Sequence, residues 1–289
     1  MTYGKGKRVS AIGYYNGTIG PIDSMLVPMN DRAVYFGDGC YEACYAINGK
    51  LFRGEAHIDR FYRSLAGLRI AFSRSAESLK QEIERCLDAA GEPNAAVYWQ
   101  VSRGTDTRHH TFPDASVQPN LLITVSAKVP DLNGTPLRLL TVPDIRYQMC
   151  NVKTLNLVPN ILAIQQAREA GADEAALHRD GVVTEGSHTN IHIIRDGALY
   201  THPLDRLILP GVTRGVLLEL CGALRIPVSE TPFTVDEMKR ADEVLITSSL
   251  LGIRRASQVD GEPVGNRADA LCRALIRAYR ERFIGEIRA

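Results

Sequence analysis

Two Asn-Gly pairs in the first fifty residues constrain the fold more than any other feature of the sequence. Asn16-Gly17 and Asn48-Gly49 stand among strand-like runs, first VSAIGYY and then CYEACYAI and KLF. Asn-Gly between such runs predicts a two-residue β-hairpin, because both residues accept the positive φ angles that this turn requires. We therefore expect antiparallel β structure in the N-terminal part of a chain that mixes strands and helices.

Hydrophobic periodicity divides the chain into two parts. Residues 54–68 and 76–90 show helical periodicity and precede strand-like runs at 95–101 and 120–125, which predicts a compact α+β unit. The turn-rich segment VPDLNGT, residues 129–135, is expected to be a linker. We thus predict a smaller α+β domain over 1–128 and a larger domain over 136–289.

The larger domain is expected to contain a mixed sheet or a barrel-like core. Its strand-like runs are LRLLTV, EAALH, NIHII, IPVSE and EVLIT. They alternate with predicted helices at about 159–170, 212–224 and 267–282. Two domains with a cleft between them would provide a ligand site, because small-molecule pockets favour such positions.

Composition narrows the class of partner. The formal net charge of +1 on 289 residues gives no excess of basic surface for nucleic acid or an anionic membrane. No apolar run suits a signal peptide or a membrane span. The six cysteines are scattered, without metal-ligand spacing, so we expect no metal site and a reducing cytoplasm. A small-molecule partner is the better expectation.

Lys153 is the first candidate for chemistry. It lies in NVKTLNLVPN, a largely apolar stretch just before the predicted amphipathic helix at 159–170. Burial disfavours the ammonium form, so a lysine in such a place can act as a nucleophile and a base. The alternative is that Lys153 simply projects into solvent, as most lysines do.

Three further segments carry polar groups that could face a ligand. Glu185 in VVTEGSHTNIHII stands at the end of a predicted strand, and Ser248 and Ser249 end the run EVLIT. In LPGVTRG, a Pro-Gly turn opens a helix at Val212, and Thr213 adds a hydroxyl where free backbone N–H groups favour phosphate. Each motif alone is also consistent with an ordinary turn or helix cap.

The loop VSRGTDTRHHTF carries Arg108 and His110, two residues apart. The guanidinium of Arg108 can bind a carboxylate through two hydrogen bonds, and His110 offers a second donor. The alternative is a solvated basic loop.

In order and spacing, these segments resemble the class IV aminotransferases, the fold type IV pyridoxal-phosphate enzymes. The matching segments are DRAVYFGDGCYE, EAHIDRFYRSL, RGTDTRHHTF, VKTLNL, VVTEGSHTNI, LPGVTRG and LITSSLLGI. The resemblance covers nearly the whole chain and implies a two-domain α/β (α+β) fold, pyridoxal 5′-phosphate as cofactor, and a homodimer with shared active sites. Within the family, Tyr41 with Arg108 and His110 is similar to the carboxylate trap of bacterial D-amino acid transaminases.

The resemblance also implies roles for single residues. Lys153 would bind the cofactor as a Schiff base and act as the catalytic base, and Glu185 would pair with the pyridine nitrogen. Leu209 would pack against the ring. The residues around the phosphate would be Arg60, Val212, Thr213, Ser248 and Ser249. His188 departs from the pattern, because these enzymes usually have a small serine there.

The implied reaction moves the amino group of a D-amino acid, such as D-alanine, to 2-oxoglutarate or pyruvate by a ping-pong mechanism. Within the family, the alternatives are an (R)-amine transaminase, a branched-chain aminotransferase and an aminodeoxychorismate lyase. A catalytically silent protein on the same scaffold is an alternative outside enzymes.

Overall fold

The structure is a computed structural model that describes residues 11–288. The strand-like run VSAIGYY begins at Val9, which lies outside the described residues together with the preceding N-terminal segment. By their contacts, the residues form two compact units. The first ends at Pro130 and also includes Lys153–Asn156, and the second comprises the remainder from Asp131. The predicted domain and linker boundaries stay a prediction.

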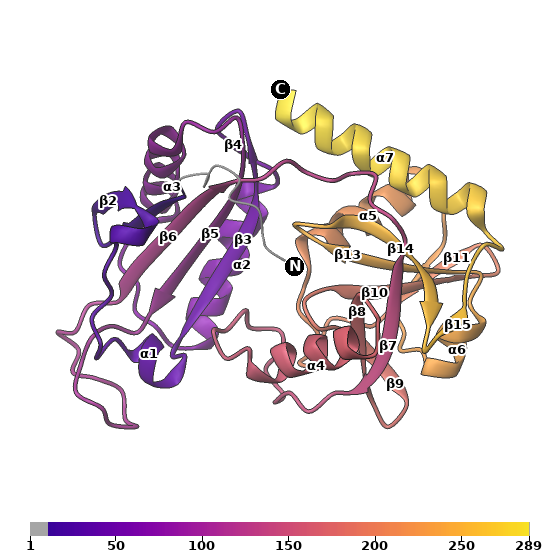
Figure 1. The fold of residues 1–289 in the computed structure, drawn as a ribbon, viewed down its shortest axis with the longest axis horizontal. Coiled ribbons are helices and arrows are strands. Elements are labelled where there is room, and N and C mark those ends of the chain that lie inside the picture. The colour runs from indigo at the N-terminus through magenta and orange to yellow at the C-terminus, as the bar shows by residue number, and fades with distance from the viewer. Residues whose placement is uncertain (1–10, 289) are drawn as a thin grey trace, which may run out of the picture. The chain divides into compact units, whose positions relative to one another are not determined.

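The first unit contains a six-stranded antiparallel sheet with the strand order β2-β1-β6-β5-β3-β4. Two long helices, α2 and α3, pack against this sheet (Figure 1). Its elements are β1 (Ile12–Tyr15), β2 (Thr18–Pro21), the 3-10 helix η1 (Ile22–Ser24), α1 (Arg32–Phe36), β3 (Gly39–Ile47), β4 (Lys50–Leu51), α2 (Gly54–Gly67), α3 (Ala76–Ala90), β5 (Asn94–Ser102) and β6 (Asn120–Ala127).

Both predicted hairpins are confirmed. Tyr15 pairs with Thr18 across Asn16-Gly17, and Ile47 pairs with Lys50 across Asn48-Gly49, so each turn has two residues. All four turn residues have positive φ, as an Asn-Gly hairpin turn requires. The predicted helices at 54–68 and 76–90 correspond to α2 and α3.

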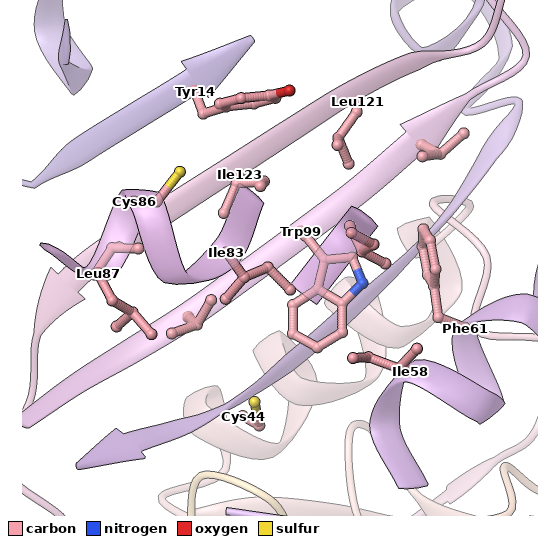
Figure 2. Close-up of a cluster of buried hydrophobic side chains, with 14 of the residues drawn as sticks. Tyr14, Cys44, Ile58, Phe61, Ile83, Cys86, Leu87, Trp99, Leu121 and Ile123 are labelled. Carbon is pink, nitrogen blue, oxygen red and sulfur yellow. The ribbon is translucent and has the colours of Figure 1, made fainter. Parts of the chain in front are cut away.

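The core of the first unit lies between its helices and one face of the sheet. Figure 2 shows Ile58 and Phe61 of α2 and Ile83 of α3 around the fully buried Trp99 of β5. Phe61 meets the indole edge-on, with 6.1 Å between ring centroids. Because side chains alternate along a strand, the residues next to Trp99 in sequence lie on the opposite face of the sheet.

The second unit is built on a nine-stranded mixed sheet in the order β12-β11-β10-β13-β14-β7-β8-β9, with β15 paired to β14. Strand β9 is the last strand in this order, yet it contacts β10, which lies near the opposite end of the order. The sheet therefore curls into a half-barrel. The strands are β7 (Leu137–Pro143), β8 (Glu174–Arg179), β9 (Val182–Gly186), β10 (Asn190–Arg195), β11 (Ala198–Thr201), β12 (Val228–Ser229), β13 (Glu243–Ser248), β14 (Gly252–Val259) and β15 (Glu262–Pro263).

Within residues 131–288, four helices complete this unit: α4 (Val158–Glu169), α5 (Val212–Ala223), α6 (Val235–Arg240) and α7 (Asp269–Arg288). Helices α5 and α7 pack against each other, and both contact β14 (Figure 1). The α/β fold class and the barrel-like sheet expected from the sequence are therefore confirmed. Within residues 11–288, no helix is long and apolar enough to cross a membrane.

The amphipathic character predicted for the helix after Lys153 is wrong. Its buried residues are the small Ala163 and Ala167, whereas Val158, Ile161 and Leu162 are exposed. The apolar side chains of α4 are thus not confined to its buried face. Exposed apolar residues of this kind are candidates for contact with another molecule.

Candidate active site

The backbone around Lys153 lies along β3 of the first unit. The carbonyl of Lys153 accepts a hydrogen bond from the Tyr41 N–H (2.9 Å), and the Leu155 N–H donates to the Gly39 carbonyl (3.0 Å). The Lys153 N–H donates to Ser64 Oγ of α2 (3.1 Å). A lysine with its backbone fixed on both sides presents its amine in a defined direction.

The side chain of Lys153 is half-buried and lies over an aromatic ring. Its Nζ is 4.1 Å from the centroid of the Tyr41 ring, which stacks on Tyr98 with 5.4 Å between centroids. The Tyr98 hydroxyl donates to Gln100 (2.7 Å). The face of an aromatic ring attracts a cation, so this arrangement can hold the protonated amine.

Arg60 of α2 is buried against the opposite face of β3. Its Nε and Nη2 donate to the two carboxylate oxygens of Glu42 (2.6 and 2.8 Å), and His57 Nδ1 lies 2.8 Å from Glu42 Oε2. Burial would raise the pKa of Glu42, but Arg60 and His57 outweigh it and hold that pKa well below its usual range. Arg60 is therefore fixed in place by a charged carboxylate.

The loop between β5 and β6 presents Arg108 and His110 to solvent. Both side chains pack on the ring of Phe36 at the end of α1. The Arg108 guanidinium is 5.2 Å from its centroid, and the His110 ring is 5.5 Å from it. Within the described residues, neither side chain makes a hydrogen bond or an ion pair. Their donors are available to an anionic ligand.

In the second unit, Glu185 lies at the end of β9 and is buried. Its Oε2 accepts hydrogen bonds from the Asn190 amide and from the Leu209 N–H, each 2.9 Å long. Its Oε1 accepts one from Arg146 Nη1 (2.5 Å). Burial raises the pKa of Glu185 to about 7, and Arg146 opposes that shift.

Asp144 and Arg146 were not predicted from the sequence. Arg146 binds both oxygens of the buried Asp144 through Nε and Nη2 (2.9 and 3.0 Å) and reaches Glu185 with Nη1. Burial alone would lower the pKa of Arg146, but the carboxylates of Glu185 and Asp144 outweigh it and raise that pKa. The signal available in the sequence was the Asp-x-Arg pair in PDIRYQM, directly after a predicted strand.

The segment from Leu209 to Thr213 is tied to Glu185. The Asn190 amide, which donates to Glu185, also donates to the Leu209 carbonyl (3.0 Å). Helix α5 begins at Val212, as predicted, with Gly211 as N-cap and no side-chain hydrogen bond at that cap. A Cβ on Gly211 would collide with the Asn190 side-chain oxygen, so the turn requires glycine. Thr213 is buried in the first turn of the helix.

Three more candidates lie on turns of the second unit. Ser248 ends β13, and Ser249 follows it in the turn to β14, where both are half-buried. His188, the departure from the family pattern, lies between β9 and β10 with 56% of its side chain exposed. Its Nδ1 is 2.8 Å from Ser187 Oγ and 3.1 Å from the buried Glu174 carboxylate.

Comparisons with known proteins identify the family. Residues 39–259 match the family Amino-transferase class IV, and the chain belongs to it. Over 255 residues the chain is 38% identical to a D-alanine aminotransferase of Staphylococcus aureus (strain COL). This match covers 88% of this chain and 90% of the relative.

Two solved structures share the fold. A branched-chain aminotransferase from Thermoproteus uzoniensis with norvaline has a TM-score of 0.87 at 24% identity, covering 96% of both chains. A T.th. branched-chain amino acid aminotransferase complexed with N-(5′-phosphopyridoxyl)-L-glutamate has a TM-score of 0.86 at 25% identity, covering 96% of this chain and 95% of that one. The chain is therefore an aminotransferase of fold type IV, and its cofactor is pyridoxal 5′-phosphate.

The residues of the second unit fit this cofactor. A carboxylate has about four acceptor positions, and Glu185 uses three for the bonds described above. The remaining position on Oε1 suits the N–H of a protonated pyridine. The start of α5 suits the phosphate, because the first N–H groups of a helix have no partner within it and Thr213 adds a hydroxyl there.

Proposed function

We propose that this aminotransferase acts on D-amino acids, such as D-alanine, with 2-oxoglutarate or pyruvate as acceptor. The observation that carries this proposal is the pair of unbonded donors on Arg108 and His110, presented together on the Phe36 ring. A guanidinium and an imidazole held in this way suit the α-carboxylate of an amino acid. The 38% identity to a D-alanine aminotransferase supports the same substrate class.

Lys153 is the proposed catalytic residue. Its amine would bond covalently to the aldehyde of the cofactor, which when bound withdraws electrons from the substrate α-carbon. When its amine is not bonded to the cofactor, Nζ of Lys153 would act as the base that takes the proton from that α-carbon. The Tyr41 ring lies beneath Nζ, 4.1 Å from it at its centroid, and limits the directions in which the amine can point. The donor would lose its amino group in a first half-reaction and leave as a 2-oxo acid, and a second 2-oxo acid would receive that group, which is a ping-pong mechanism.

Glu185 is the proposed partner of the pyridine nitrogen. A charged carboxylate there keeps the nitrogen protonated and strengthens electron withdrawal. Arg146 and Asn190 hold that carboxylate through both of its oxygens. Arg146, itself fixed by Asp144, thus favours the charged form of Glu185 in a buried environment.

The proposed phosphate site consists of the start of α5 together with side chains from other elements. Val212 would donate its backbone N–H and Thr213 its hydroxyl, and the helix dipole would favour the negative charge. Ser248 and Ser249 would add hydroxyls, and Arg60 a guanidinium oriented by Glu42. Leu209 would pack against the ring next to Glu185, to which its N–H is bonded.

We also propose a homodimer with shared active sites, located in the cytoplasm. Exposed apolar side chains support the dimer, including Leu26, Met29 and Val34 in the first unit and those of α4 in the second. Apolar surface of this kind commonly marks a protein interface. The six free cysteines, five of them buried, fit a reducing compartment. Sedimentation equilibrium should give twice the chain mass, whereas a monomer with full activity would exclude shared sites.

A substrate panel tests the proposed reaction. The loaded enzyme is mixed with paired D- and L-amino acids and with (R)-amines, and the visible absorbance of the cofactor is followed. We expect conversion with D-alanine and not with L-alanine. Conversion only by L-leucine or L-valine would indicate a branched-chain enzyme, and conversion by amines without a carboxylate would indicate an amine transaminase. Pyruvate released without any acceptor would indicate a lyase.

A labelling experiment tests the proposed role of Lys153. Borohydride reduction of the loaded enzyme should fix the cofactor on the peptide that contains Lys153, as detected by mass spectrometry. Lys153→Ala should carry no label, whereas Lys128→Ala, on another lysine of the same unit, should be labelled like the unaltered enzyme. Label on any other lysine would overturn the assignment.

A further inference from the structure

The loop that carries Arg108 and His110 is anchored by a buried arginine of α1. Arg32 Nη1 donates to the carbonyl oxygen of His109 (2.9 Å), the residue between the two exposed donors. Only 3% of Arg32 is exposed, although its partner loop reaches the surface. A single guanidinium therefore connects the interior of the first unit to the tip of this loop.

Arg32 is itself held by a charged cluster. Its Nε donates to Asp38 Oδ2 (2.8 Å), and Arg103 binds both oxygens of Asp38 through Nε and Nη2 (2.9 and 3.0 Å). Arg103 also donates to the carbonyls of Arg69 and Leu68 (2.9 and 2.8 Å). Asp38 thus fixes the direction of Arg32, and Arg103 fixes Asp38.

The base of the loop is tied to the same part of the chain. The Arg32 N–H donates to the Gly104 carbonyl (2.9 Å), and the Asp106 N–H donates to the Asn30 carbonyl (3.2 Å). Within the loop, His109 Nε2 lies 2.9 Å from the Asp106 carboxylate. These bonds fix the loop at both its base and its tip.

Phe36, four residues after Arg32, supports the side chains of the loop. Its ring lies under the guanidinium of Arg32 at 4.9 Å and contacts Arg108 and His110. Helix α1 thus contacts both the backbone of the loop, through Arg32, and its two exposed side chains, through Phe36. This arrangement defines where both donors point before a ligand arrives.

We propose that Arg32, oriented by Asp38, is a positioning residue for recognition of the substrate carboxylate, because it holds Arg108 and His110 in a preformed arrangement on Phe36. The inference rests on the proposed function, in which those two residues bind the carboxylate. Binding groups that are ordered in advance lose less freedom when the ligand binds, so their affinity is higher.

The first measurement follows the loop itself. In Arg32→Gln, amide hydrogen exchange of residues 105–111 should rise by about tenfold, while exchange of α3 stays unchanged. Arg32→Lys keeps the charge but cannot bind Asp38 and the His109 carbonyl together. Hydrogen exchange of the loop should therefore rise in this variant too. Arg85→Gln, which removes an exposed arginine of α3, is the matched control. Unchanged exchange of the loop in both Arg32 variants would overturn the proposal.

The second measurement separates KM from kcat in the loaded enzyme. For D-alanine, Arg32→Gln and Phe36→Leu should raise KM by about tenfold and change kcat by less than about twofold. In an Arg108→Ala background, Arg32→Gln should add little, since the two residues act through one site. An equal loss of kcat, or full additivity, would contradict positioning through the loop.

The same variants distinguish failure of this inference from failure of the proposed function. If Arg108→Ala leaves the KM for D-alanine unchanged, the carboxylate trap itself is wrong. If Arg108→Ala raises KM while both Arg32 variants leave it unchanged, the trap stands and the positioning role is wrong.

Discussion

Replacing Arg146 with methionine tests how the protein keeps a carboxylate charged in a buried place. The change removes the guanidinium that joins Asp144 to Glu185, two carboxylates whose side chains are 0% and 6% exposed. Methionine fills a similar volume, so the main effect is electrostatic. Glu185 keeps its bonds from Asn190 and Leu209, but both donors are uncharged.

The expected loss follows from the burial of these groups. Removing one partner of a buried ion pair costs about 3 to 5 kcal/mol when the other charge stays. Burial already raises the pKa of Glu185 to about 7, and Arg146 is the largest influence that lowers this pKa. Without Arg146, Glu185 can therefore take up a proton, which limits the loss of stability. We therefore expect a loss of about 3 kcal/mol in the unfolding free energy of the cofactor-free protein.

Chemical denaturation at about pH 7.5 measures the change in stability, and a titration with pyridoxal 5′-phosphate measures the change in cofactor affinity. Arg146→Met should lose both stability and cofactor affinity, because a neutral Glu185 no longer favours a protonated pyridine. Arg179→Met is the matched control, since Arg179 binds Asp144 and the Arg146 carbonyl but not Glu185, and is 23% exposed. Equal losses in both variants, or unchanged cofactor affinity in Arg146→Met, would show that Arg146 does not act through Glu185.

Three further predictions concern the second unit. Gly211→Ala should weaken cofactor binding by more than about tenfold in a spectroscopic titration, because its Cβ collides with Asn190; unchanged affinity would contradict that turn geometry. Thr213→Val should weaken the competition of inorganic phosphate with the cofactor, whereas an unaltered inhibition constant would place the phosphate elsewhere. A Glu185 pKa raised from 4.5 to about 7 means that the folded cofactor-free protein loses stability as the pH rises through that range, by about 3 kcal/mol. Glu185→Gln should remove this slope in pH-dependent denaturation, and an identical slope in both proteins would assign it to other groups.

Short-range patterns predicted much of the fold. The Asn-Gly turns and the helix at 76–90 follow local rules, because turn φ angles and helix caps are decided within a few residues. Helix α1 was missed because it has only five residues. Its signals were present in Asp31, whose carboxylate caps the Ala33 N–H (2.8 Å), and Gly37, which ends the helix with positive φ.

Sequence patterns could not predict the buried charged networks. Arg146 and Glu185 are 39 positions apart, and Arg32 and His109 are 77 positions apart. The residues of such pairs come into contact only in the folded chain. In the sequence alone, each of them is typical of an ordinary surface charge.

Lys153, Glu185 and Thr213 were found because each lies in a short motif with its own chemistry, and so were the two serines after β13. Arg60 and Leu209 came only from the resemblance to the family. The roles of all these residues stay predictions until the labelling and binding experiments are done.

The most direct test of the proposed D-amino acid transaminase activity is the enantiomer preference of the loaded enzyme in a complete reaction. Purified enzyme with pyridoxal 5′-phosphate and 2-oxoglutarate is given D-alanine or L-alanine, and pyruvate is measured. We expect pyruvate from D-alanine and none above background from L-alanine. Pyruvate from L-alanine alone would contradict it.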